Sequence, residues 1–367
     1  MSMYTSCIIG QFKLLHPHVT SFADCGFMIA GKFGREVMAI SQNLFLIFIM
    51  AAHIVAFSVA MNALTEHAAC TIAFMFAGCI ICGILSLPRT LKGISVWSYF
   101  SCASVAIAVL VAMVGVGIMR PGVGTEAVVQ QGIPIVEVVN SILNIAVSYA
   151  GHAAYFGFAS ELKKPKDFYK SVLMTQVTST VFYAIVGLVV YHFVGPGVMS
   201  PALGSASPTV RKVAYGLAMP TIIISGVVNG SVVSKYAYTR WCRHRMHHKN
   251  LGALIPWWLI LVVVWVLAWL IAESIPTFSL MLAVISALFV GWFSYGLPSV
   301  LWFHMNRRQL TESAQKLGLV TINLLILTFG AAVCFVGLYA SIKALKDGEG
   351  AKPWSCKSNY DSPPPAK

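Results

Sequence analysis

The sequence predicts an all-helical protein that crosses a membrane many times. Apolar residues make up 58% of the chain and charged residues only 10%, and the mean hydropathy is +0.78. A soluble protein carries roughly a quarter charged residues. Long apolar runs recur along the 367 residues, with short polar breaks between them. Because about 20 apolar residues cross the hydrocarbon core as a helix, this pattern indicates a polytopic membrane protein.

Nine apolar segments are long enough to cross the bilayer as full spans. A short apolar stub, Met3–Gly10, precedes them and is too short to cross. The tail, 343–367, is rich in proline, glycine and charge, and it is predicted to be disordered. We therefore expect one transmembrane domain, 1–342, followed by that tail. In chain order the spans cover 37–60, 68–88, 94–118, 139–160, 170–194, 213–233, 254–274, 277–302 and 318–342.

The charges of the loops predict which side of the membrane each loop occupies. If the segment 11–36 is cytoplasmic, alternate loops hold seventeen lysines and arginines, whereas the opposite loops between helices hold only Arg120, Arg211 and Lys212. This asymmetry follows the positive-inside rule and argues against nucleic acid as the target of the net charge of +13. The tail then lies on the outer side. The seventeen are Lys13, Lys32, Arg35, Arg89, Lys92, Lys163, Lys164, Lys166, Lys170, Lys235, Arg240, Arg243, Arg245, Lys249, Arg307, Arg308 and Lys316.

The span 139–160 carries an unusual group of polar residues at membrane depth. Polar groups in lipid usually face a cavity or a packed interior. Most members of the group recur at helical spacing, and Gly151 offers a point where the helix can unwind and expose backbone groups to a substrate. His152 titrates near neutral pH and is a candidate for carrying a coupling proton, or else a hydrogen-bonded packing residue. The candidate substrate-binding residues are Asn144, Ser148, Tyr149, Gly151, His152 and Tyr155.

Two further places are candidates for function. Ser225, Asn229 and Ser231 put a small, polar patch in the span 213–233, which could line an ion or substrate pathway or simply allow close helix packing. Glu161 ends the polar span on the cytoplasmic side, where it could pair with a cation to hold an inner gate shut or stay a solvated loop residue.

The chain carries no motif of an enzyme or an ATP-driven pump. Cys79 and Cys82 lie in an apolar run with no second pair, so we interpret them as core residues and predict no metal or other cofactor. The nine cysteines form an odd, dispersed set, from which no disulfide framework can be inferred.

Three stretches of sequence resemble the amino acid/auxin permease family, and within it the neutral amino acid permeases of filamentous fungi. They are AVSYAGHAAYFGFASELKKPKDF, QFKLLHPHVTSFADCGFMIAGKFGRE and LSLPRTLKGIS. The resemblance runs from about Ser6 to the end of the last span. It implies a leucine-transporter-like fold of eleven helices, in which two five-helix repeats are inverted relative to each other. It also implies a substrate held between the broken first and sixth helices, usually with proton coupling.

Mapped by motif, the sixth helix of that family is the span 139–160, with Ser148 to Tyr155 as its unwound part. The stub then resembles only the end of the second helix. We therefore expect the first helix and half of the second to be missing, either because the gene model starts at an internal methionine or because the product is a degenerate or regulatory transporter fragment.

The function predicted from residues and resemblance together is secondary transport of neutral amino acids, coupled to protons or another ion, through the plasma or vacuolar membrane. The alternative is a non-transporting remnant or an amino acid sensor of the same fold. The expected partners are a neutral amino acid, the coupling ion and the lipid bilayer.

Overall fold

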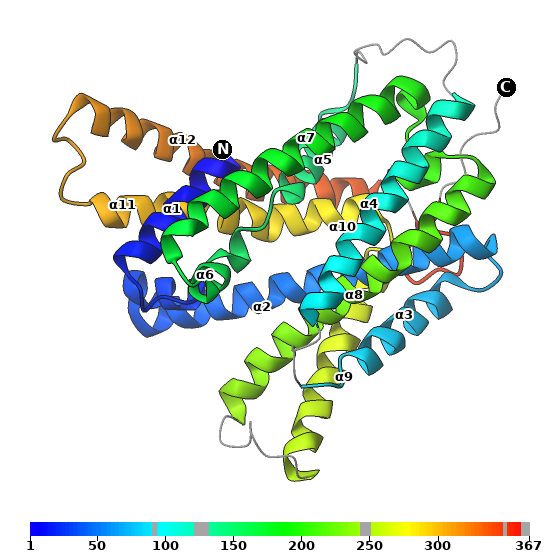
Figure 1. Cartoon of the computed structure of the whole chain (residues 1–367), viewed down its shortest axis with the longest axis horizontal. Helices are drawn as coiled ribbons and strands as arrows, with labels where there is room; N and C mark the ends of the chain where they lie inside the picture. Colours follow the sequence, from blue (N-terminus) through cyan, green and yellow to red (C-terminus); the bar gives the residue numbers. More distant parts are fainter. Residues whose placement is uncertain (90–93, 121–131, 243–250, 348–350, 361–367) are drawn as a thin grey trace. The chain divides into compact units, whose positions relative to one another are not determined.

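The computed structural model describes residues 1–89, 94–120, 132–242, 251–347 and 351–360. Every regular element in these ranges is helical (Figure 1). The chain forms two compact units. Unit 1 comprises Met1–Phe45, Gly132–Tyr183 and Leu282–Asp347, and unit 2 comprises Leu46–Gln131, Ala184–Met281 and Gly348–Lys367.

Seven helices of the described ranges are long and apolar enough to cross a membrane. The polytopic membrane fold predicted from composition is thereby supported, while two of the nine predicted spans take another form. The span 68–88 contains only the short helix α3 (Thr71–Leu85), and the span 139–160 is divided into α5 (Ile135–Ser148) and α6 (His152–Glu161). The seven long helices cover Phe22–Thr65, Trp97–Met119, Pro165–Gly197, Pro208–Trp241, Leu251–Ser274, Phe278–Asn306 and Ala314–Lys346.

Unit 1 begins with α1 (Ser2–Leu15), the helix that contains the predicted stub, and continues into α2 (Phe22–Thr65). The segment 11–36, treated above as a cytoplasmic loop, is therefore largely helical. α2 breaks at Gly31, which has a φ of 62°, a conformation that glycine adopts without a steric penalty. Gly26 and Gly34 lie against each other across this break, and a Cβ on either residue would overlap the backbone of the other.

The core of unit 1 lies where α5, the π-helical segment η5 (Ser286–Gly296) and α12 (Ala314–Lys346) meet. Leu143, Ala287 and Val333 are buried together there. Gly291 and Gly330 let η5 and α12 approach closely, because a Cβ on Gly330 would lie 2.5 Å from the carbonyl oxygen of Gly291. Small residues at such a crossing allow backbone contact between membrane helices.

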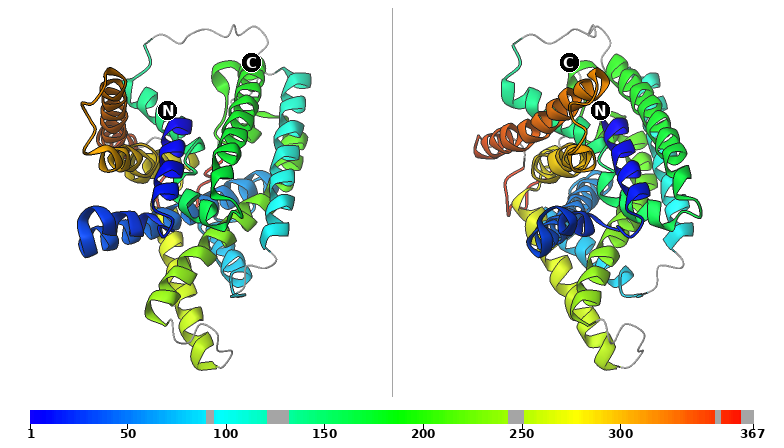
Figure 2. Two further views of the ribbon diagram at one scale, coloured as in Figure 1. Left: turned by 60° about the vertical axis from the view of Figure 1, so that its left-hand side comes forward. Right: turned by 90° about the vertical axis from the view of Figure 1, so that its left-hand side faces the viewer.

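η5 leads directly into α11 (Leu297–Asn306), which folds back beside α12 as a helical hairpin (Figure 2). Pro298 is the second residue of α11, and its missing backbone N–H removes one hydrogen bond to the preceding turns of the continuous helix. Wide π turns are rare and often occur at functional positions, which makes the Gly291–Gly296 stretch notable.

Unit 2 is built from the second part of α2 and from α3, α4 (Ile94–Met119), α8 (Pro208–Trp241) and α9 (Leu251–Ser274). α8 contacts both α4 and α9. The indole of Trp265 on α9 lies against Gly230 on α8, where a Cβ would come within 2.8 Å of the ring. α7 (Phe168–Val194) is divided between the two units. Its C-terminal part belongs to unit 2 and contributes Val190 and Val194 to a small hydrophobic cluster with Val116 and Ala206.

A C-terminal stretch, residues 351–360, packs on unit 2 and is joined to it by a disulfide between Cys70 and Cys356. This stretch falls within the tail for which the composition predicts disorder, and the dispersed cysteines gave no sign of the pairing.

Candidate functional site

The helix predicted to unwind is interrupted at Tyr149–Gly151. α5 ends at Ser148, Tyr149 has non-helical angles (φ −107°, ψ 14°), and α6 starts at His152 with Gly151 as its N-cap. The break is shorter than the Ser148–Tyr155 stretch that the resemblance implies. A helix C-terminus and a helix N-terminus thus face the same three residues, which gives carbonyl groups on one side and amide groups on the other.

Gly151 is a point of close contact at this break because of a side chain rather than because of its backbone angles. A Cβ on Gly151 would lie 2.8 Å from the hydroxyl oxygen of Tyr155. The bare glycine lets the Tyr155 ring fold back toward the break, where it lies 5.0 Å from the His152 ring between centroids.

His152 is fully buried and held by the start of α1. Its Nε2 lies 3.0 Å from each of three oxygens, the carbonyl of Ser2 and the hydroxyls of Thr5 and Ser6. Both hydroxyls are also placed to donate to the Ser2 carbonyl, at 3.0 Å from Thr5 and 2.7 Å from Ser6. Since a carbonyl only accepts, Nε2 carries the proton of the neutral imidazole.

The other ring nitrogen of His152 is then an acceptor. Nδ1 is buried and has no hydrogen-bond partner within the described part of the chain. Buried polar atoms are nearly always paired, so this acceptor is an exception among the polar groups at the break.

A cavity of about 490 Å³ lies beside the break, within unit 1. This volume is in the range of small-molecule pockets. Tyr149, Gln176, Thr180 and Tyr295 line it together with Ser2 and neighbouring apolar residues, and none of the lining side chains is an acid or a basic group. Tyr295 comes from η5, so the π-helical segment contributes directly to the cavity wall.

Gln176 is a cavity residue that the sequence analysis missed. It lies on α7, is 8% exposed, and donates from Nε2 to the hydroxyl of Ser2 at 3.2 Å and toward that of Tyr155 at 3.5 Å. A glutamine on an apolar span is a visible signal, but the sequence did not show that α7 faces the break.

The two remaining residues of the predicted polar face lie apart from the cavity lining. Asn144 is half-buried and its side-chain oxygen is unpaired within the described residues. Ser148 is exposed, and its hydroxyl donates to the carbonyl of Asn144 at 3.0 Å. The break at Tyr149 changes the direction of the chain, so residues that share one face of a continuous helix separate here.

The polar patch of α8 serves two surfaces of unit 2. Ser225 and Asn229 line a groove of about 350 Å³ with serines of α4 and with Thr221. Ser231 lies on a second, mainly apolar pocket beside Pro220 and Trp97. Gly226 and Gly230, which lie within this patch, pack against Trp265 of α9.

Glu161, the predicted inner gate, is exposed at the end of α6. The ion pairs found among the described residues are Arg35–Glu36, Lys170–Asp167 and Lys212–Glu66, and none involves Glu161. In the same described ranges, no group of three or more histidine, cysteine or acidic residues could hold a metal ion.

The comparison with protein families matches residues 1–343 to the family described as "Transmembrane amino acid transporter protein". Among curated proteins, the chain is similar to an "N amino acid transport system protein" of Neurospora crassa, at 33% identity over 370 residues. That alignment covers 96% of this chain and 78% of the relative.

Two proteins described as "Transmembrane transporter" are also similar. The one from Fusarium pseudograminearum is 28% identical and the one from Gibberella moniliformis is 27% identical, each over 98% of this chain. The alignments cover 78% and 79% of those relatives. These families and relatives are transporters rather than enzymes, in agreement with the absence of catalytic motifs. The family predicted from the motifs is confirmed, and this multi-pass membrane protein belongs to the transmembrane amino acid transporter family.

Proposed function

We propose that this chain carries neutral amino acids across the plasma or vacuolar membrane and that proton movement drives the transport. The observation that carries the proposal is the Tyr149–Gly151 break beside a cavity without charged side chains. An amino acid presents a carboxylate and an ammonium group. The N-terminal end of α6 suits the carboxylate, and the carbonyl end of α5 suits the ammonium.

Selectivity for neutral side chains follows from the lining of the cavity. No lining side chain would offer an opposite charge to a charged substrate side chain, and an unpaired charge in a low-dielectric site is strongly disfavoured. The hydroxyl and amide groups of Tyr149, Gln176 and Thr180 suit small polar or apolar side chains instead.

His152 is the proposed proton carrier. Its Nε2 is engaged with Ser2, Thr5 and Ser6, so an incoming proton would bind Nδ1 and convert the ring to an imidazolium. Because Tyr155 lies between this ring and Gln176, protonation is coupled to the cavity through adjoining side chains.

For the architecture, we propose nine crossings in an inverted-repeat arrangement of the leucine-transporter type. In it, α3 and the pair α5–α6 cross the membrane in addition to the seven long helices. A broken helix that lines a cavity is the usual place for substrate in such folds, because non-helical backbone at membrane depth is tolerated only there.

The direct test is uptake into liposomes that contain the purified full-length chain. An inward proton gradient should drive accumulation of labelled neutral amino acids, and a protonophore should abolish it. Accumulation of none of them above empty liposomes would refute transport. Binding without uptake would instead support the alternative, an amino acid sensor.

A further inference from the structure

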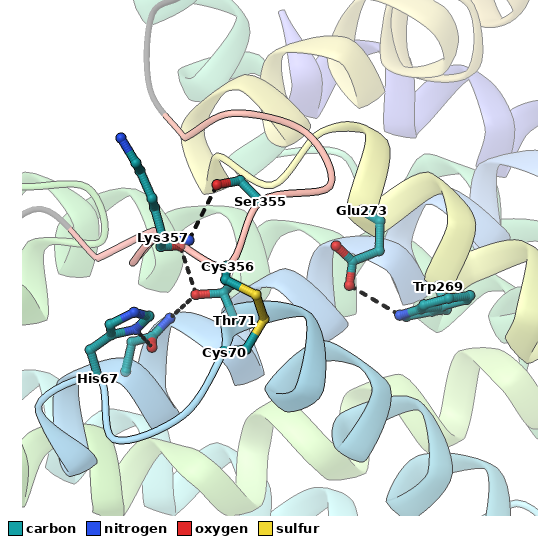
Figure 3. Close-up of a disulfide and its surroundings, with 9 residues drawn as sticks. His67, Cys70, Thr71, Trp269, Glu273, Ser355, Cys356 and Lys357 are labelled. Atoms are coloured by element: carbon teal, nitrogen blue, oxygen red, sulfur yellow. Dashed lines mark hydrogen bonds between the residues drawn. A yellow bond between two sulfur atoms is a disulfide. The ribbon is translucent and has the colours of Figure 1, made fainter.

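The C-terminal stretch 351–360, named here the strap, binds the ends of several unit 2 helices (Figure 3). Its disulfide joins Cys356 to Cys70, the residue that caps the start of α3, across a sequence separation of 286. Next to this bond, the hydroxyl of Thr71 donates to the carbonyl of Lys357 at 2.8 Å. The covalent link is therefore embedded in a hydrogen-bonded contact.

Asn359 connects the strap to α2 and to the turn after α9. Its side-chain nitrogen donates to the hydroxyl of Ser58 at 2.8 Å and to the carbonyl of Pro276 at 3.1 Å. Its side-chain oxygen accepts from Asn62 at 2.8 Å. Ser58 and Asn62 are buried, so these groups would lose hydrogen bonds if the strap were absent.

The two ends of the strap bind α9 and α8. The backbone N–H of Trp354 donates to the carbonyl of Glu273 at 3.3 Å, and its ring packs edge-on against Trp269 at 5.7 Å. At the other end, the Arg211 guanidinium donates to the Tyr360 hydroxyl and lies over its ring, at 5.1 Å from the centroid.

These contacts explain two cations that the loop charges leave on the outer side. Arg211 and Lys212 lie in the first turn of α8, where the helix dipole disfavours positive charge. Tyr360 accepts a hydrogen bond from Arg211, and Glu66 forms an ion pair with Lys212 at 2.6 Å. Lys212 lowers the pKa of the Glu66 carboxyl, so the pair stays ionised at neutral pH.

The side of the membrane follows from two independent observations. The loop charges place the α2–α3 turn and the C-terminal segment on the side opposite the basic loops. Disulfides form and persist in oxidising compartments outside the cytosol, and the Cys70–Cys356 bond lies on that same side.

We propose that residues 351–360 form a disulfide-closed strap on the extracytoplasmic side of the membrane, which holds the outer ends of α2, α3, α8 and α9 together. The bond forms by thiol–disulfide exchange with the disulfide of an oxidoreductase. The thiols of Cys70 and Cys356 are oxidised to one S–S bond, and the carrier disulfide is reduced to two thiols, which take up the two protons.

The first test is the redox state of the pair in cells. Free thiols are blocked under denaturing conditions with N-ethylmaleimide, and the protein is then reduced and labelled with maleimide-polyethylene glycol. The wild type and a Cys102→Ser control should gain two adducts, while Cys70→Ser and Cys356→Ser should gain none. No adduct on the wild type, or two on Cys70→Ser, would overturn the proposal.

The second test is the side of the membrane. An N-glycosylation acceptor appended to the C-terminus should acquire a glycan that an endoglycosidase removes. The same acceptor placed in the 307–313 turn, on the predicted cytoplasmic side, should stay unmodified. The opposite result would place the strap in the cytosol and overturn the proposal whether or not the chain transports amino acids.

The third test is thermal stability in detergent. Cys70→Ser should lower the apparent melting temperature by roughly 5–10 °C, and Asn359→Ala, which keeps the disulfide, by roughly 2–5 °C. A reductant should lower the wild-type value to that of Cys70→Ser and leave Cys70→Ser unchanged. If Cys70→Ser and Asn359→Ala both have the same melting temperature as Cys102→Ser, the strap does not hold the helix ends together.

Discussion

At the scale of single residues, the proposed function rests on His152 and Gln176. His152 has one nitrogen committed to the start of α1 and one buried acceptor with no partner among the described residues. Gln176 supplies two amide hydrogens, which lie toward Ser2 and Tyr155 at the cavity wall. In the proposed function, the ring is the proton site and the amide provides polarity without charge.

We expect His152→Gln to uncouple uptake from the proton gradient. The glutamine amide can still donate to the Ser2 carbonyl, so the contact with α1 is retained, but it has no nitrogen that titrates near neutral pH. Uptake driven by an inward pH gradient should disappear, while exchange of labelled for unlabelled substrate should persist. Unchanged dependence of uptake on the gradient would exclude His152 as the proton carrier.

Gln176→Leu should weaken substrate binding. The substitution removes the amide from the cavity wall, and losing one hydrogen bond between this amide and a bound substrate costs about 1–3 kcal/mol. The KM for neutral amino acids should therefore rise roughly tenfold. Gln309→Leu, the same change at an exposed position between α11 and α12, should leave the KM unchanged. Equal effects of the two changes would contradict a role for Gln176 in the cavity.

At the scale of elements, the break between α5 and α6 and the close contact of η5 with α12 define the region of the site. The α5–α6 break was predictable, because a glycine among polar residues in an apolar span is visible in sequence. The partners of His152 were not, since nothing in an apolar sequence tells which helix each face contacts. The π turns of η5 were also invisible in the sequence, as was the close approach of Gly291 to Gly330.

The contact between η5 and α12 predicts opposite effects for two glycines of one helix. In Gly330→Ala the new methyl group would overlap the backbone of Gly291, so we expect a loss of about 1–3 kcal/mol in stability. Gly318→Ala, with open space around it, should stabilise α12 by about 0.5–1 kcal/mol. Thermal unfolding in detergent measures both. If Gly330→Ala changed the stability in the same way as Gly318→Ala, the close approach of η5 and α12 would be contradicted.

At the scale of the whole molecule, composition and loop charge predict a great deal because lipid imposes them on the entire chain. The membrane class was accessible in this way, whereas the family was accessible from three characteristic stretches of sequence. The strap was not, because its cysteines are 286 residues apart and its composition is that of a disordered tail. Pairing at such a separation depends on which helix ends meet, and only the fold specifies that.

Substrate binding should stabilise the whole chain, because a ligand that binds only the folded state shifts the unfolding equilibrium. At a concentration of 100 times the Kd, the gain is about 2.7 kcal/mol. Neutral amino acids should therefore raise the melting temperature of the purified chain, and lysine and glutamate should not, since no charged side chain lines the cavity. The shift should shrink in Gln176→Leu and persist in His152→Gln at neutral pH. Equal shifts with lysine or glutamate would refute selectivity for neutral side chains, whether or not the chain transports what it binds.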